Sequence, residues 1–300
     1  MRLTAALRSR KLPGDAIGSQ QLSFHPGAVT PGEYRFAIGT AGSTTLVLQT
    51  VLIPLLLADG PSRLVLEGGT HNPFAPPFDF LDRSYMPLIH RMGPSVSMTL
   101  ERPGFYPAGG GRFVVDIQPC EKLRALQIPV RGEIVDRSAR AVVSGLPLHI
   151  AERECEAICA RMNWDSDCST AEAVEEPRGP GNIVTMELES EYITEVFTGF
   201  GERDRSAEKV AGLAVQQVQR YLASGAAAGE YLTDQLLLPM AVAVHRGAEG
   251  CGFHAQTISR HSETHIELIH RFLNCRVTLE DAANRSVMVK VALPDSDSRS

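Results

Sequence analysis

The sequence predicts an α/β (α+β) fold: a large domain of repeated βαβ-type units with a smaller inserted α/β domain. Segments typical of strands and of helices alternate along the chain, as they do in layered α/β proteins. A length of 300 residues suits roughly two domains. Near residue 131 the alternation restarts with turn signals of its own. We therefore expect an inserted domain over 131–226 and the main body over 1–130 and 227–300.

The composition is that of a globular protein. Hydrophobic residues make up 43% of the chain and charged residues 21%, which excludes a disordered or collagen-like chain. The formal net charge of −6 excludes indiscriminate binding to nucleic acid or anionic membranes, but it is compatible with a local pocket for one phosphorylated end. The N-terminal residues lack the apolar stretch of a signal peptide, and the longest apolar segment, 46–58, is too short to span a bilayer. We expect a cytoplasmic protein with no membrane partner.

In the first part of the chain a Pro-Gly turn separates two predicted strands, 19–29 and 33–38. A glycine-bearing loop then leads into a buried helix that Ser43 can cap and that extends through Leu57. Apolar runs between turn residues predict the next elements, which are strands at 63–66, 96–101 and 113–118 and a helix at 78–92.

The predicted insertion has its own series of elements, namely strands at 133–144 and 183–189, helices at 151–162 and 207–223, and a Gly/Pro loop at 178–182. The chain returns to the main body at Gly229. Its last part predicts a helix at 230–244, a strand before His261, a helix at 264–273 and two terminal strands.

His261 is the first candidate for chemistry. Thr264 and Glu267 fit a capping box, which places His261 just before a helix N-terminus. The positive end of the helix dipole disfavours an imidazolium and attracts phosphate, so a neutral, nucleophilic imidazole beside an anionic substrate is reasonable there. A structural histidine is the alternative.

A zinc site is a further alternative for this region, with the candidate ligands Cys251, His254, His261 and His265. Their spacing matches no familiar zinc finger, and the sequence His-Ser-Glu-Thr-His differs from H-E-x-x-H because its Glu is misplaced. The six cysteines contain no C-x-x-C pair, and we expect them to be reduced.

Polar residues at the start of the 230–244 helix form a second candidate group. Asp234 could hold a divalent cation bound to phosphates, and Tyr231 could stack on a base. An ordinary acidic first turn explains them equally well. Gln49, inside an apolar helix, needs either a core partner or a pocket. The glycine-rich loops include neither a Walker A sequence nor G-x-G-x-x-G, which argues against classical P-loop and Rossmann sites.

Six sequence motifs, taken together and in their order, resemble the RNA 3′-terminal phosphate cyclase family over nearly the whole chain. The motifs are GTAGSTTLVLQT (39–50), EGGTHNPFAPPFDFL (67–81), RPGFYPAGGG (102–111), GPGN (179–182), GEYLTDQLLLPMA (229–241) and HSETHI (261–266). The resemblance implies an ATP-dependent conversion of an RNA 3′-phosphate into a 2′,3′-cyclic phosphate. It also implies a large domain of repeated α/β units with a smaller inserted one.

Site roles follow from the same resemblance, residue by residue. His261 matches the family histidine that becomes adenylylated by ATP. Asp234 matches a contact for a divalent cation, Mg or Mn. The positions that match nucleotide-binding residues are Gln49, Pro77, Tyr231, Leu232, Thr233, Asp234 and Gln235. Pro77 and Tyr231 would form the two faces of an adenine slot.

The sequence departs from the family pattern in two places. Family members open with a strand and a Gly-Glu-Gly-Gly-Gly-Gln stretch, and nothing in this sequence corresponds to them. We therefore expect a shortened member with impaired turnover. His265 stands where the family usually has Asn. A non-catalytic relative that binds RNA or assembling ribosomal particles is the alternative function, and the presence of His261 argues against it. The quoted motifs disfavour a distant enolpyruvyl-transferase-like enzyme.

Overall fold

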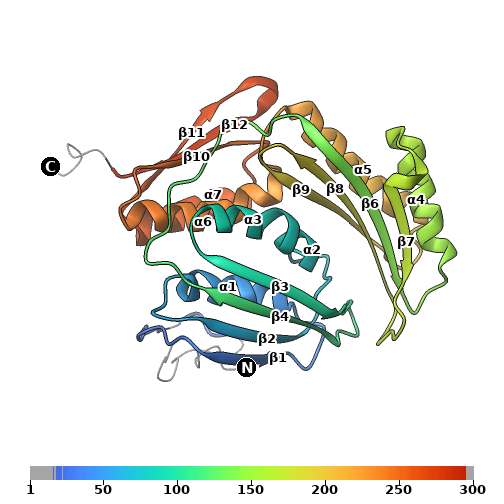
Figure 1. The fold of residues 1–300 in the computed structure, drawn as a ribbon, viewed down its shortest axis with the longest axis horizontal. Coiled ribbons are helices and arrows are strands. Elements are labelled where there is room, and N and C mark those ends of the chain that lie inside the picture. Colours follow the sequence, from blue (N-terminus) through green and yellow to red (C-terminus); the bar gives the residue numbers. More distant parts are fainter. Residues whose placement is uncertain (1–15, 17, 22, 295–300) are drawn as a thin grey trace.

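The computed structural model describes residues 16, 18–21 and 23–294, which form a mixed α/β structure with three four-stranded sheets. Two of the sheets and their helices make up the main body, and the third sheet lies beside them with two helices of its own (Figure 1). The predicted fold class is confirmed. No helix among these residues is both long enough and apolar enough to cross a bilayer.

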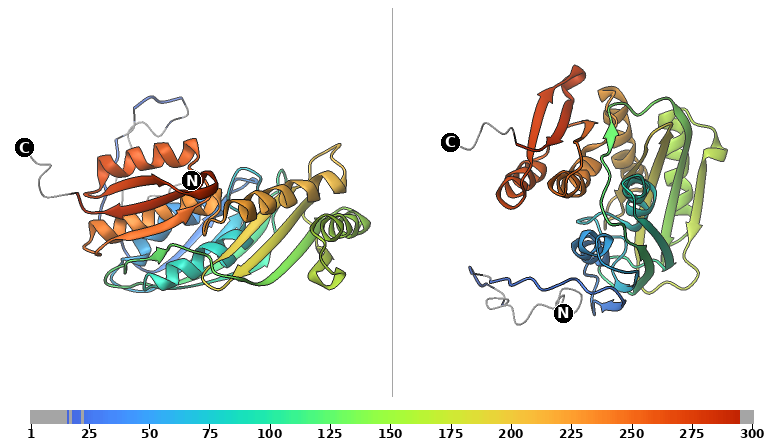
Figure 2. Two further views of the ribbon diagram at one scale, coloured as in Figure 1. Left: turned by 90° about the horizontal axis from the view of Figure 1, so that it is seen from above. Right: turned by 60° about the vertical axis from the view of Figure 1, so that its left-hand side comes forward.

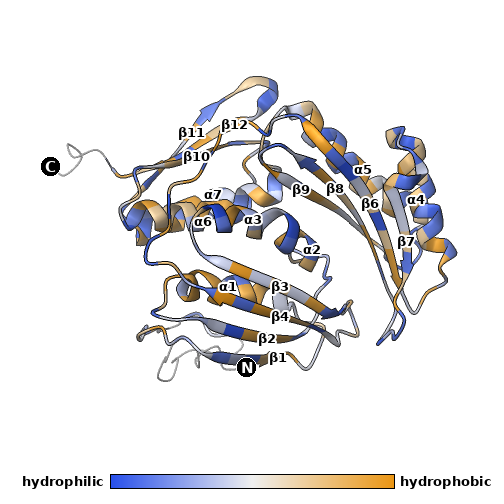
Figure 3. Cartoon of the chain, viewed as in Figure 1, coloured by the Kyte–Doolittle hydropathy of each residue, from blue (hydrophilic) through white to orange (hydrophobic). Residues whose placement is uncertain are grey.

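The first sheet has the strand order β1-β2-β4-β3. Its strands are β1 (Glu33–Ala37), β2 (Ser62–Gly68), β3 (Ser95–Arg102) and β4 (Gly111–Gln118). β1 runs parallel to β2, and the remaining pairs are antiparallel. Helix α1 (Thr44–Leu56) packs on this sheet and is hydrophobic along most of its length (Figure 3). The backbone N–H of Leu46 donates to the Ser43 hydroxyl at 3.2 Å, which confirms the predicted cap.

The predicted helix at 78–92 is one continuous helical segment with a wider turn in its middle. It consists of α2 (Phe78–Phe80), a π-helical turn η1 (Leu81–Tyr85) and α3 (Met86–Arg91). Phe80, Leu81, Leu88 and Ile89 are all buried, as their spacing predicts.

The second sheet has the strand order β11-β12-β10-β5 and carries the helices that supply most of the candidate site residues. Its strands are β5 (Gln127–Ile128), β10 (Cys251–Ala255), β11 (Arg276–Asp281) and β12 (Val287–Ala292). Helices α6 (Glu230–His245) and α7 (Arg260–Phe272) lie side by side on one face of this sheet (Figure 2). Buried residues on α6 join those of α1 in a single hydrophobic core.

The third sheet has the strand order β7-β6-β8-β9. Its strands are β6 (Ile134–Ser144), β7 (Ser169–Ala173), β8 (Gly181–Ser190) and β9 (Thr194–Phe200). Helices α4 (His149–Met162) and α5 (Ala207–Ser224) cover one face and enclose a hydrophobic cluster distinct from that of the main body. Val196 of β9 instead packs into the main core. β9 therefore lies at the junction between the two bodies, and the division at 131 and 226 stays a prediction.

Three expectations about elements were wrong or incomplete. The described residues of 19–29 form no strand, and Leu22 lies outside them. β7 and β9 were not predicted, although both belong to the third sheet. α7 begins at Arg260 rather than at Thr264. Short 3-10 turns at Ser166–Cys168 and Ala283–Arg285 complete the element order.

Candidate active site

His261 lies in the first turn of α7, one residue inside the helix. The N-cap is Ser259, whose hydroxyl accepts from the backbone N–H of Ser262 at 3.1 Å. The expected capping box is wrong, because the Thr264 hydroxyl donates within the helix to the Arg260 carbonyl at 3.1 Å. His261 still lies at the positive end of the helix dipole, and 83% of its side chain is exposed.

The carboxylate of Asp234, on the neighbouring helix α6, pairs with the His261 ring. Oδ1 of Asp234 lies 2.9 Å from Nδ1 of His261 and 3.4 Å from Nδ1 of His265. Burial alone would raise the pKa of Asp234, but the hydrogen bonds from His265 and His261 outweigh it and lower this pKa below its usual value. Because an ionised carboxylate can only accept, Nδ1 carries the hydrogen in the neutral form of the His261 ring, and Nε2 then holds the lone pair.

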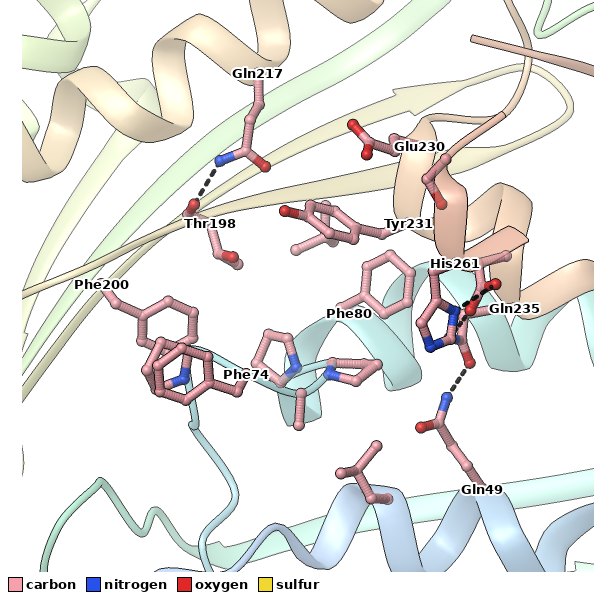
Figure 4. A pocket seen from close by; sticks show the side chains of 18 residues that line it. Gln49, Phe74, Phe80, Thr198, Phe200, Gln217, Glu230, Tyr231, Gln235 and His261 are labelled. Atoms are coloured by element: carbon pink, nitrogen blue, oxygen red, sulfur yellow. Dashed lines mark hydrogen bonds and ion pairs between the residues drawn. The ribbon is translucent and has the colours of Figure 1, made fainter. Parts of the chain in front are cut away.

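Two glutamines extend this pair into a chain of hydrogen bonds. Nε2 of Gln49 donates to Oε1 of Gln235, and Nε2 of Gln235 lies 3.4 Å from Oδ2 of Asp234. Gln49 therefore finds its partner across the interface between α1 and α6, at the edge of a pocket (Figure 4). The chain Gln49–Gln235–Asp234–His261 links three helices.

A cavity of about 490 Å³ opens beside His261. We name it the nucleotide cavity after the role that the sequence predicts for its lining residues. Tyr231, with 62% of its surface exposed, lies on one side, and the loop from Pro73 to Pro77 forms another. Figure 4 shows Phe74 and Phe200 at the end away from His261. The volume and the mainly apolar walls with a few polar groups are typical of a small-molecule site.

A second cavity, of about 370 Å³, shares Gln49, Asp234, Gln235 and His261 with the first. It continues between α1 and α7, where Thr264, His265 and Leu268 are among its lining residues. His261 is therefore accessible from two cavities rather than one.

The structure brings together six of the eight residues that the sequence singled out, and it separates two. His261, Asp234, Gln235, Tyr231, Gln49 and Pro77 all line the nucleotide cavity. The side chains of Leu232 and Thr233 do not line it, because both are fully buried in the core. They share the first turns of α6 with the lining residues but point to its opposite face.

The candidate zinc ligands do not converge. Nε2 of His254 lies 2.7 Å from the Ser286 hydroxyl, whereas His261 and His265 turn toward Asp234. Within the described residues, no group of three or more His, Cys, Asp or Glu side chains could hold a metal ion.

Several lining residues were missed by the sequence reasoning. They are Leu46, Pro73, Phe74, Ala75, Pro76, Phe80, Val196, Thr198, Phe200, Gln217, Glu230 and Ser259. The proline-rich text of 73–77 was a usable signal, since it predicts a fixed loop. The residues of β9 gave none, because that strand was itself not predicted.

The donor groups suit a cation that arrives with phosphates. Oδ2 of Asp234 has one long contact, with Gln235, so this oxygen can bind a metal ion. Two carboxylate residues, Glu230 and Asp234, line the nucleotide cavity, and no lysine or arginine is among its described lining residues. A triphosphate there needs a counter-charge, and Mg²⁺ is commonly bound by one or two carboxylates plus substrate phosphates.

Comparisons with known proteins show which family this chain resembles. A family model described as RNA 3′-terminal phosphate cyclase matches residues 1–279. The chain is 44% identical over 293 residues to the RNA 3′-terminal phosphate cyclase of Koribacter versatilis (strain Ellin345), covering 98% of this chain and 80% of the relative. It is 45% identical over 285 residues to the protein of that name from Ralstonia nicotianae (strain ATCC BAA-1114 / GMI1000), covering 95% of this chain and 80% of that relative.

Proposed function

The chain belongs to the RNA 3′-terminal phosphate cyclase family, and we propose that His261 carries the family reaction here. That reaction is the ATP-dependent conversion of an RNA 3′-phosphate into a 2′,3′-cyclic phosphodiester. One observation supports the assignment most strongly. Asp234 binds Nδ1 of His261 at 2.9 Å, and Nε2 has no hydrogen-bond partner among the residues that the structure describes. Nε2 is thus free to act as a nucleophile.

In the first step, Nε2 of His261 attacks the α-phosphorus of ATP. A phosphorus–nitrogen bond forms, the bond to pyrophosphate breaks, and the ring gains positive charge. The carboxylate of Asp234 holds the Nδ1 hydrogen and stabilises that charge, as the acidic partner does in other His-based sites.

In the second step, an oxygen of the RNA 3′-phosphate attacks the adenylyl phosphorus and releases His261. The RNA end now carries AMP as a good leaving group. The adjacent 2′-hydroxyl attacks the RNA phosphorus and gives up its proton to solvent. The bond from this phosphorus to AMP breaks, AMP departs and the cyclic ester remains. Because the nucleophile belongs to the same nucleotide, it acts at high effective molarity, and the need for a 2′-hydroxyl selects RNA over DNA.

The nucleotide cavity suits the adenosine of ATP. Tyr231 and Pro77 line it from different elements and would flank the base. A divalent cation, Mg or Mn, would bind Asp234 and the ATP phosphates and would offset their charge. The second cavity, which shares His261, offers the RNA 3′ end a separate approach. The need for ATP and RNA in one compartment favours a cytoplasmic location.

The test is covalent labelling. Incubation with ATP labelled at the α-phosphate and a divalent metal should give an acid-labile protein adduct that His261→Ala abolishes. His149→Ala is a matched control, since His149 is exposed at the start of α4. An RNA with a 3′-phosphate should then discharge the adduct and become cyclic. An adduct of undiminished yield in His261→Ala would refute the assignment.

A further inference from the structure

The loop that forms one wall of the nucleotide cavity is closed by a clasp. The clasp is the contact between His71, before the loop, and Asp79, after it; Nε2 of His71 lies 2.9 Å from Oδ2 of Asp79. The backbone N–H of Phe78 donates to the Thr70 carbonyl at 3.1 Å and closes the same loop. His71 is 3% exposed, and neither His71 nor Asp79 lines the nucleotide cavity. The clasp therefore does not touch a ligand there.

The clasp is anchored to the third sheet. The second carboxylate oxygen of Asp79, Oδ1, accepts a hydrogen bond from Nη2 of Arg140 on β6. Nη1 of Arg140 lies 3.3 Å from Glu172 of β7. The same sheet supplies the opposite wall of the cavity through Thr198 and Phe200 of β9. Asp79 thus connects the loop to the body that faces it.

The His71 ring is fixed from its other side as well. Its Nδ1 lies 2.7 Å from the Thr70 hydroxyl, which in turn accepts from the backbone N–H of Gly104 at 2.9 Å. The ring stacks on Phe105 with centroids 5.1 Å apart. Phe105 packs against Gly181 of β8, where it leaves no room for a side chain. Both ends of the clasp are therefore linked to the third sheet, His71 through Phe105 and Asp79 through Arg140.

The carboxylate carries a full charge in this position. Burial alone would raise the pKa of Asp79, but hydrogen bonding to His71 and the charge of Arg140 lower it well below its usual value. Loss of this carboxylate would leave the donors of His71 and Arg140 without their acceptor. A buried donor without an acceptor destabilises a protein by more than a formed hydrogen bond stabilises it.

Resting on the proposed function, we propose that Asp79 is a positioning residue that sets the width of the nucleotide cavity. By holding His71 and Arg140 at once, it fixes the distance between the 73–77 loop and β9. It therefore governs the affinity for ATP, whereas the chemical step belongs to His261 and Asp234.

The test separates binding from chemistry. In Asp79→Asn, the apparent KM for ATP in His261 adenylylation should rise about tenfold, with the maximal rate within about twofold, because the substituted residue touches no reacting atom. Arg140→Gln should also raise the KM for ATP, and this variant tests the same contact if Asp79→Asn does not fold. The KM of the double variant should rise by less than the two single fold-changes multiplied together, since either substitution alone breaks the same contact between Asp79 and Arg140.

Arg83→Ala is the matched control. Arg83 pairs with Glu187 of β8 at 2.7 Å, so it also joins the main body to the third sheet, but it lies in η1, outside the loop. The KM for ATP of Arg83→Ala should equal that of the native chain. An unchanged KM in folded Asp79→Asn and Arg140→Gln would overturn the proposal, and so would an equal rise in Arg83→Ala.

Equilibrium dialysis with labelled ATP makes the outcome independent of catalysis. In a His261→Ala background, Asp79→Asn should weaken ATP binding about tenfold, which corresponds to about 1.4 kcal/mol. If the native chain binds ATP but forms no adduct, the proposed function fails, and the dialysis result still decides the role of Asp79.

Discussion

Nδ1 of His261 lies 2.9 Å from Oδ1 of Asp234, although the two residues are 27 positions apart and belong to different helices. The contact fixes which nitrogen of the neutral ring carries the hydrogen, and it leaves the lone pair of the other nitrogen out of this bond. The same carboxylate has a lowered pKa, so it is ionised and can accept this hydrogen at neutral pH. The chemistry that we assign to His261 depends on this pairing.

Asp234→Asn should lower the rate of adduct formation by roughly 100-fold or more, because the amide neither fixes the ring tautomer nor stabilises the charged ring. Single-turnover labelling at saturating ATP and metal measures it. Glu230→Gln is the matched control, since Glu230 lines the same cavity, whereas the hydrogen bond of the His261 ring is made with Asp234. A rate within a few-fold of the native value would mean that Asp234 does not orient the nucleophile.

Tyr231→Ala should raise the KM for ATP about tenfold, because stacking of a base on an aromatic ring contributes roughly 1–3 kcal/mol. Tyr231→Phe keeps the ring and should stay close to the native KM. The concentration dependence of adduct formation gives both values. Equal effects of the two variants would show that the hydroxyl, and not the ring, contacts the nucleotide.

Removal of divalent metal should abolish adduct formation. Glu230 and Asp234 line the nucleotide cavity, and their carboxylates repel a triphosphate. Treatment with a chelator, followed by Mg²⁺ or Mn²⁺, should suppress and then restore labelling. Undiminished labelling in the chelator would exclude the metal role that we propose for Asp234.

Glu195 should make stability depend on pH. This residue of β9 is 2% exposed, and its carboxyl accepts from the backbone N–H of Gly229, the N-cap of α6. Burial raises its pKa from 4.5 to about 8, and the buried Tyr221 lies nearby. The folded chain therefore keeps a proton that the unfolded chain loses above its own pKa. Stability should fall as pH rises from about 4.5 to about 8.

Glu195→Gln keeps the acceptor for Gly229 without the titration. Its Tm, measured between about pH 5 and about pH 9, should fall less steeply than that of the native chain, with a difference of a few degrees at the alkaline end. Some slope should persist, because burial also raises the pKa of Glu154 to about 7. Parallel Tm curves for the two proteins would contradict the assignment to Glu195.

Much of the fold could be predicted because local patterns determine it. The apolar run after Ser43 gives a buried helix, and the polar Ser43 gives its cap. β7 was missed because its residues are small or polar and half exposed, as on an edge strand. β9 contains Gly199, which weakens the strand pattern.

The site could be predicted only in part, because local patterns do not determine how the helices and sheets pack against one another. Thr264 and Glu267 match the capping pattern as well as a true cap does, yet Ser259 caps α7 and brings His261 and His265 to Asp234. Whether a residue such as Thr233 faces the core or the cavity depends on the packing of α6. The pair of Asp79 and Arg140, 61 positions apart, arises from the docking of the third sheet. No local pattern encodes it.

The most direct measurement of the central claim is the mass of the intact protein after incubation with ATP and Mg²⁺, followed by peptide mapping. We expect one added adenylyl group, attached to His261 and lost in acid. An adenylyl group on another residue, or none at all under conditions where ATP binds the nucleotide cavity, would contradict it.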